Sequence, residues 1–208
     1  MSNGLRRGLY VITDSTLTDS DHLPAQVGQA IAGGAVAVQY RDKSTDRQQR
    51  LLQARALAGV CRAAGVPLIV NDDVELAAEA EADGVHLGRD DADIADARRR
   101  LGKRALIGVS CYNELERARH GATAGADYLA FGRFFPSPTK PDAVQADIEL
   151  LSAARRTLSV PLVAIGGITP ENGGRLVAAG ADLLAVVHGV FGAPDAGVAA
   201  AAYARLFD

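Results

Sequence analysis

Residues 178–189 read AAGADLLAVVHG: a turn of small residues, then a short apolar run, then a histidine and a glycine. Related phrases occur upstream as AGGAVAV (32–38), AEADGVHL (80–87) and TAGADYLAF (123–131). Each phrase joins the end of a helix-like segment to a run that is apolar at nearly every position. Such runs are typical of parallel strands that are buried on both faces. The repeat therefore predicts a succession of βα units.

Eight apolar runs of this kind fall along the chain. They are LYVIT (9–13), AVAVQY (35–40), PLIVN (67–71), GVHL (84–87), ALIGVS (105–110), DYLAFG (127–132), PLVAIGG (161–167) and LLAVVHG (183–189). The segments between them are rich in alanine and predicted helical, and Gly65, Gly125 and Gly180 stand where three helices should end. Eight units predict an α/β fold, a single-domain (β/α)8 TIM barrel over residues 1–208. A doubly wound open sheet is the alternative architecture.

Composition narrows the class of function. The formal net charge is −3, and the basic run at 98–100 stands at a predicted helix end, so no nucleic-acid partner is expected. No run approaches the roughly 18 apolar residues of a membrane span, and the start lacks a signal-peptide pattern, so no membrane partner is expected. Cys61 and Cys111 are too few for a disulfide framework. We expect a cytoplasmic enzyme acting on small molecules, with a homodimer as a compatible assembly.

Polar residues and glycines gather where the predicted strands end, which is where barrels of this type carry their active sites. The stretches are QYRDK (39–43), NDD (71–73), HLGRDD (86–91), Ser110, FPSPTK (135–140), GG (166–167) and HG (188–189). The glycines after the seventh and eighth strands would let backbone N–H groups approach a phosphate. They could instead serve only to make tight turns. The two loops together favour a phosphate pocket.

Cationic and acidic side chains flank the same predicted mouth. Arg41, Lys43 and Lys140 supply positive charge suited to a second, more highly charged phosphate. Asp72 and Asp91 are hard oxygen ligands of the type that Mg²⁺ prefers, although helix capping is an alternative role for aspartates at such positions. A diphosphate site, Mg²⁺ and a separate monophosphate pocket together indicate a transferase with a pyrophosphate leaving group.

Taken together, these stretches resemble the thiamine-phosphate synthase family. The resemblance rests on QYRDK (39–43), ND (71–72), GVHLGRDD (84–91), GVS (108–110), FFPSPTK (134–140) and AIGGI (164–168), in the family's order along nearly the whole chain. It implies that a hydroxymethylpyrimidine diphosphate loses pyrophosphate and that the nitrogen of a thiazole phosphate attacks the exocyclic carbon, giving thiamine phosphate. It also implies a pyrimidine carbocation, so that the protein mainly stabilises separating charge.

The resemblance assigns roles to residues of this chain. Gln39, Tyr40, Arg41, Asp42, Lys43, Asn71, Ser110 and Lys140 would hold the pyrimidine diphosphate, with Arg41, Lys43, Ser110 and Lys140 as the catalytic residues. Asp72 and Asp91 would bind Mg²⁺. Ser137, Pro138, Thr139, Gly167, Val187 and His188 would hold the thiazole phosphate. The family usually has a serine at the position of His188, so the backbone N–H is a candidate anchor there.

Three other functions compete with this one. A thiazole tautomerase shares the barrel, but its expected histidine lies two residues beyond the serine, where this chain has Tyr112. Another phosphate-barrel isomerase or lyase would share the glycine loops without needing Asp72 and Asp91. A non-catalytic thiamine-precursor binding protein would not need groups that stabilise a leaving group. The cations and carboxylates favour the synthase over all three.

Other polar residues near the mouth receive a structural interpretation. His86 lies inside an apolar run and is expected to be a core or rim histidine with satisfied hydrogen bonds. Asp73 and Asp90 are expected to cap helices. Cys111 follows Ser110, but no histidine is clearly placed to activate it, so a nucleophilic role is not expected.

Overall fold

The computed structural model describes residues 5–136 and 144–208, in which eight parallel strands form a closed barrel. The strands are β1 (Gly8–Ile12), β2 (Ala35–Tyr40), β3 (Leu68–Asn71), β4 (Gly84–Leu87), β5 (Leu106–Tyr112), β6 (Tyr128–Gly132), β7 (Leu162–Ile165) and β8 (Leu183–Val186). They pair in chain order, and β8 closes the ring on β1, with Gly8 opposite Leu183. The predicted barrel is confirmed, and the open sheet is excluded.

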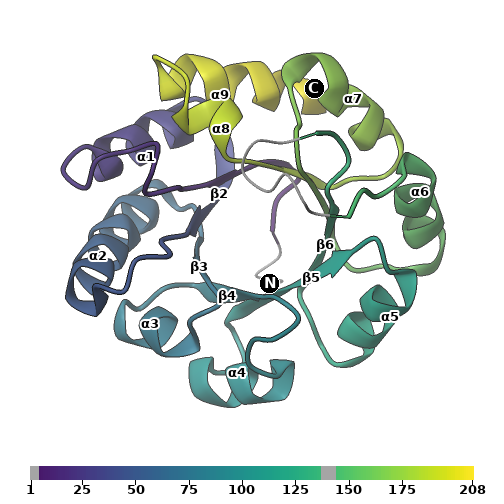
Figure 1. The fold of residues 1–208 in the computed structure, drawn as a ribbon, viewed down its shortest axis with the longest axis horizontal. Helices are drawn as coiled ribbons and strands as arrows, with labels where there is room; N and C mark the ends of the chain where they lie inside the picture. Colours follow the sequence, from purple (N-terminus) through teal and green to yellow (C-terminus); the bar gives the residue numbers. More distant parts are fainter. Residues whose placement is uncertain (1–4, 137–143) are drawn as a thin grey trace.

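Helices surround this ring of strands (Figure 1). They are α1 (Leu23–Ala32), α2 (Arg47–Ala64), α3 (Val74–Glu79), α4 (Ile94–Leu101), α5 (Leu115–Thr123), α6 (Ile148–Thr157), α7 (Pro170–Ala178), α8 (His188–Phe191) and α9 (Ala196–Ala204), followed by the 3₁₀ turn η1 (Arg205–Phe207). Two helices, the single-turn α8 and then α9, follow the last strand. Within the described residues, no helix combines the length and apolar character that crossing a membrane requires.

Local sequence sets the bounds of these helices, as α2 illustrates. Its first turn is capped by Asp46, whose carboxylate accepts the N–H of Gln49 at 3.0 Å. It ends at Gly65, whose φ of 65° lies in the left-handed region that glycine adopts at little cost. Between these ends, Leu57 and Cys61 belong to a buried stripe that packs on the barrel.

Side chains alternate between two apolar layers along each strand, because successive residues of a strand point to opposite faces. In β1, Tyr10 belongs to the cluster inside the barrel, whereas Val11 packs beneath the helices. In β2, Ala37 points inward and Tyr40 outward. This alternation decides which residues at the strand ends can reach the central cavity.

The turn phrases of the sequence repeat share a hydrogen-bond pattern. In three of them, an aspartate just before one strand pairs with a residue at the start of the neighbouring strand. The aspartate carboxylate accepts the backbone N–H of that residue, and the aspartate N–H donates to its carbonyl oxygen. The pairs are Asp83 with Leu68, Asp127 with Ile107 and Asp182 with Leu162, with N···O distances of 2.7–2.8 Å. The fourth phrase has Gly34 at the corresponding position. Each of these aspartates therefore links two neighbouring strands at the amino-terminal end of the barrel, and this pair of hydrogen bonds is called the clamp below.

Candidate active site

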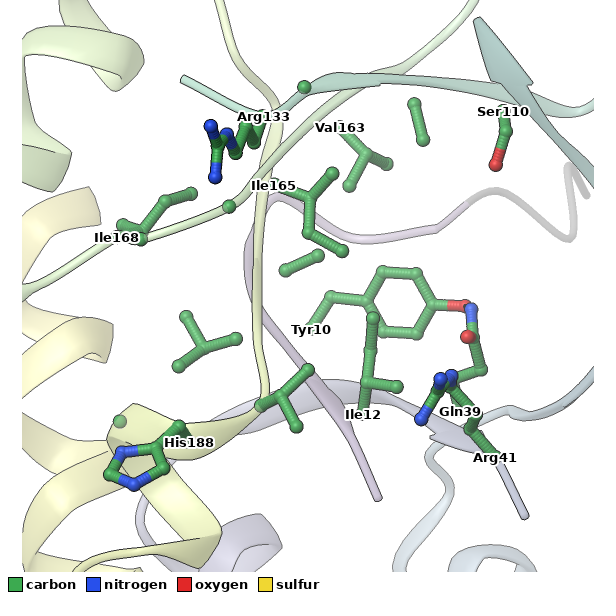
Figure 2. Close-up of a pocket in the computed structure, with 18 of the residues that line it drawn as sticks. Tyr10, Ile12, Gln39, Arg41, Ser110, Arg133, Val163, Ile165, Ile168 and His188 are labelled. Atoms are coloured by element: carbon green, nitrogen blue, oxygen red, sulfur yellow. The ribbon is translucent and has the colours of Figure 1, made fainter. Parts of the chain in front are cut away.

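A cavity of about 350 Å³ opens among the carboxyl ends of the strands and takes lining residues from all eight. Seven of the predicted site residues line it: Gln39, Arg41, Asn71, Ser110, Gly167, Val187 and His188. In Figure 2, Gln39, Arg41 and Ser110 lie at one end of the cavity, while Arg133, Ile168 and His188 lie at the other. The cavity thus has two ends that are lined by different sets of residues.

The loop after β1 holds Arg41 in place. The guanidinium Nη1 of Arg41 lies 3.0 Å from Oδ2 of Asp14, and both side chains are largely buried. The backbone N–H of Arg41 also donates to the hydroxyl of Thr13 at 2.9 Å. Burial acts to raise the pKa of Asp14, but hydrogen bonds from Thr16 and the Arg41 guanidinium outweigh it and lower that pKa. Arg41 is therefore a fixed cation at the cavity wall.

Two carboxyl groups and a lysine meet at the ends of β3 and β4. Nζ of Lys43 lies 2.6 Å from Oδ2 of Asp72, and the N–H of Gly88 donates to Oδ2 of Asp91 at 2.5 Å. Burial acts to raise the pKa of Asp72, but hydrogen bonds with Lys43 and Asp91 lower it. Burial and the contact with Asp72 raise the pKa of Asp91. The two carboxyl groups therefore interact directly, and a bound cation would favour the ionised form of both.

Two carboxyl groups are a donor set that suits Mg²⁺. Among the residues that the structure describes, no cluster of three or more His, Cys, Asp or Glu side chains could hold a metal ion. Mg²⁺ is commonly bound through one or two carboxylates together with water and substrate phosphates. Asp72 has a left-handed backbone, with φ of 64°, a conformation that aspartate tolerates better than most residues.

Two predicted binding residues point away from the cavity. The hydroxyl of Tyr40 donates to Oε1 of Gln53 on α2 at 2.6 Å. The carboxylate of Asp42 accepts the N–H of Ser44 at 2.7 Å. Both line a second cavity, of about 310 Å³, between the loops that follow β1 and β2. Strand alternation explains this placement, since Gln39 and Arg41 occupy the inward positions.

Two glycines after β7, Gly166 and Gly167, line the other end of the cavity. Gly167 has φ of 63°, and a Cβ there would come within 2.3 Å of the carbonyl oxygen of Pro136. Glycine is therefore required here by its left-handed backbone and by the close approach of the segment after β6. The exposed imidazole of His188 lies over Gly192, the residue that follows α8, and is directed away from Ile168 (Figure 2).

Four predicted binding residues fall outside the part of the chain that the structure describes, and four residues in or near the cavity were not predicted. Ser137, Pro138, Thr139 and Lys140 lie outside the described residues. Asp14, Arg133, Tyr10 and Tyr128 were not predicted, although Asp14 and Arg133 directly follow strands and could have been found at those ends. Arg133 lines the cavity at the His188 end (Figure 2).

Cys111 and His86 have the structural environments expected of them. Burial raises the pKa of the Cys111 thiol to about 12, so the thiolate that a nucleophile requires does not form near neutral pH. Both ring nitrogens of His86 have hydrogen-bond partners, at 3.0 and 2.9 Å.

Comparison with known proteins identifies the family. The sequence profile described as thiamine monophosphate synthase matches residues 9–190. The chain belongs to this family. The thiamine-phosphate synthase of Aromatoleum aromaticum is 57% identical over 202 residues, covering 97% of each chain. That of Thiobacillus denitrificans is 57% identical over 200 residues, covering 96% of this chain and 94% of the relative. The predicted resemblance is confirmed.

Solved structures agree with this assignment. Thiamine phosphate pyrophosphorylase from Pyrococcus furiosus superposes with a TM-score of 0.87 at 33% identity, covering 97% of this chain and 96% of that one. A 3-hexulose-6-phosphate synthase superposes with a TM-score of 0.70 at 17% identity and shows likeness of fold alone. The family's enzymes belong to thiamine synthesis, and the chain is a member over nearly its whole length.

Proposed function

We propose that the protein joins hydroxymethylpyrimidine diphosphate to a thiazole phosphate, giving thiamine phosphate and pyrophosphate. The observation that carries the proposal is the two-ended cavity, in a chain 57% identical to proteins named thiamine-phosphate synthase. In the reaction, the bond between the exocyclic carbon and the diphosphate oxygen breaks, and its electron pair leaves on pyrophosphate. The lone pair of the thiazole nitrogen then forms the new carbon–nitrogen bond.

The polar end of the cavity is proposed to bind the pyrimidine diphosphate. Gln39, Asn71 and Ser110 would hold the heterocycle, and Arg41 and Lys43 would bind the diphosphate together with Lys140. Arg41 is suited to this role because its ion pair with Asp14 already fixes the guanidinium at the cavity wall. A cation that is in place before the reaction stabilises the departing charge without reorganising.

Mg²⁺ is the proposed cofactor, with Asp72 and Asp91 as its protein ligands. The position of these two residues after the neighbouring, paired strands β3 and β4 supports this assignment. When bound, Mg²⁺ supplies positive charge that makes pyrophosphate a better leaving group. Lys43, which contacts Asp72, adds a second cation beside that site.

The glycine-rich end of the cavity is proposed to bind the thiazole phosphate. Gly167, Val187 and the backbone of His188 would supply N–H groups to the phosphate, with Ser137, Pro138 and Thr139 completing the pocket. Two separate anion sites would hold the two substrates with their reacting atoms facing one another, which lowers the entropic barrier to reaction.

Release of pyrophosphate tests this function. The protein is incubated with each substrate alone and with both, with Mg²⁺ and with EDTA. We expect release only when both substrates and Mg²⁺ are present. Isomerisation of the thiazole without pyrophosphate release would indicate the tautomerase. Binding of the precursors without turnover would indicate a binding protein. Either of these results would overturn the proposal.

We also propose that the protein works in the cytoplasm, where its two free cysteines, both buried, would stay reduced. A homodimer stays a prediction from the sequence, and light scattering of the purified protein would test it.

A further inference from the structure

A continuous chain of hydrogen bonds runs through the barrel interior. Nε2 of Gln39 donates to the hydroxyl of Tyr10 at 2.8 Å, and that hydroxyl lies 2.9 Å from the hydroxyl of Tyr128. The Tyr128 hydroxyl lies 3.0 Å from Nδ1 of His86, whose Nε2 lies 2.9 Å from Oγ of Ser110. The chain links β2, β1, β6, β4 and β5. It begins and ends on Gln39 and Ser110, which both line the cavity.

Packing holds the middle of this chain in one arrangement. Tyr10 and Tyr128 are at most 1% exposed, and their rings meet edge to face with centroids 5.9 Å apart. The His86 ring stacks on Tyr128 at 5.5 Å and an interplanar angle of 22°. Gly108 leaves the space that Tyr128 occupies, because a Cβ at Gly108 would lie 1.9 Å from Cζ of that ring. This chain of hydrogen bonds from Gln39 to Ser110, called the relay below, is therefore rigid as well as buried.

The orientation of the Gln39 amide sets the direction of donation along this chain of hydrogen bonds. The hydroxyl of Tyr10 accepts from Gln39, so its one hydrogen is available for Tyr128. Tyr128 then donates its own hydrogen to Nδ1 of His86. Burial raises the pKa of both phenols, so each keeps its hydrogen.

The direction of the chain also sets the histidine tautomer. With Nδ1 as an acceptor, neutral His86 carries its proton on Nε2 and donates it to Oγ of Ser110. The hydroxyl hydrogen of Ser110 then points elsewhere, and Ser110 becomes a donor toward the cavity. At the other end, one of the two N–H groups of the Gln39 amide donates to Tyr10, and the amide oxygen is available as an acceptor.

We propose that Tyr10, Tyr128 and His86 are positioning residues that fix the direction of these hydrogen bonds. As a result, Ser110 donates a hydrogen bond to the ligand and Gln39 accepts one from it. The ligand that matches is a heterocycle with a ring nitrogen that accepts and an exocyclic amine that donates. An analogue carrying an oxo group in place of that amine presents the opposite pattern. The inference rests on the proposed function, because the pyrimidine is the substrate assigned to this end of the cavity.

Binding of two pyrimidine diphosphates tests the proposal in the Mg²⁺-loaded protein. One probe is the amino compound, and the other is its oxo analogue, each titrated calorimetrically. A mismatched buried hydrogen bond costs about 1–3 kcal/mol, so we expect the wild type to prefer the amino compound by roughly 10- to 100-fold. In Tyr128→Phe the relay is interrupted, His86 can adopt either tautomer, and the preference should fall to within about 3-fold.

Tyr203→Phe is the matched control. Its hydroxyl donates to the carbonyl oxygen of Ile168 at 3.0 Å, and the residue is also buried, but it lies outside the relay. This variant should keep the wild-type preference between the two probes. An unchanged preference in Tyr128→Phe, or an equal loss in Tyr203→Phe, would overturn the proposal. If neither probe binds the wild type, the proposed function itself fails, so the two failures are distinguishable.

The tautomer itself is read in the wild-type protein, and a variant is needed only to assign the signal. In protein with ¹⁵N-labelled histidine, NMR distinguishes a protonated from an unprotonated imidazole nitrogen, and the His86 signal is assigned by its absence from His86→Asn. We expect protonated Nε2 and unprotonated Nδ1 at neutral pH. The opposite tautomer would show that the chain runs from Ser110 to Gln39, and the proposed polarity would be wrong.

Discussion

Nζ of Lys43 lies 2.6 Å from Oδ2 of Asp72, so two residues that the sequence assigned to different ligands are direct partners. Lys43 was assigned to the diphosphate and Asp72 to Mg²⁺. Their contact places the proposed diphosphate site and the proposed Mg²⁺ site side by side at the mouth of the barrel. It also means that the lysine partly neutralises the carboxylate pair when Mg²⁺ is absent.

Asp72→Ala should abolish Mg²⁺-dependent turnover while leaving the barrel folded. Loss of a group that stabilises the departing charge typically lowers kcat by roughly 100- to 1,000-fold. The measurement is the initial rate across a Mg²⁺ titration, with circular dichroism to check the fold. Asp73→Ala is the control, because Asp73 caps α3 and should affect stability rather than the Mg²⁺ response. Near-normal activity in Asp72→Ala would refute the metal assignment.

His188→Ser should preserve activity. The imidazole lies over Gly192, just after α8, rather than toward Ile168, so its loss should leave the backbone N–H groups at this end of the cavity in place. We expect KM for the thiazole phosphate to stay within about 3-fold of the wild-type value, a change below roughly 1 kcal/mol. A large rise in that KM, with KM for the pyrimidine diphosphate unchanged, would instead give the ring its own role in binding.

Asp182→Ala should destabilise the barrel without touching the cavity. The carboxylate of Asp182 accepts the N–H of Leu162 and pairs with Arg155, so its removal leaves a strand-end N–H and a cation without their partner. Urea unfolding should show a loss of about 1–3 kcal/mol. Asp96→Ala, which removes an exposed pairing with Arg99, should leave the unfolding midpoint nearly unchanged. Equal effects of the two substitutions would argue against the clamp.

Gly108→Ala should disrupt the Tyr128 relay. The added methyl group would overlap the Tyr128 ring, and overpacking of this kind costs about 1–3 kcal/mol or more. Gly59→Ala is the control, because a Cβ at this position in α2 meets nothing within 4 Å. It should stabilise the protein by about 0.5–1 kcal/mol, since alanine favours a helix over glycine. Thermal unfolding of the two variants should move in opposite directions, and a tolerated Gly108→Ala would be evidence against tight packing at Tyr128.

The fold could be predicted from sequence because each βα unit is local. Eight apolar runs, alanine-rich segments and helix-ending glycines such as Gly65 all act within a few residues of one another. The inward and outward placement of Arg41 and Tyr40 also follows from strand alternation.

The hydrogen-bond relay could not be predicted in the same way. Tyr10 and Tyr128 lie 118 residues apart in sequence and meet only because the sheet closes into a barrel. Both read as core aromatics in an apolar run, and nothing local marks them as partners of Gln39 or His86. Asp14 is an intermediate case, since its position after the first strand is visible but its partner Arg41 is not.

The central claim is tested most directly by measuring both products of one incubation. The wild-type protein is mixed with hydroxymethylpyrimidine diphosphate, thiazole phosphate and Mg²⁺, and thiamine phosphate is measured by mass spectrometry alongside pyrophosphate. The proposed reaction forms the two products in equal amounts, and neither forms when EDTA removes the metal. Pyrophosphate without thiamine phosphate, or no product from either substrate, would contradict the assignment.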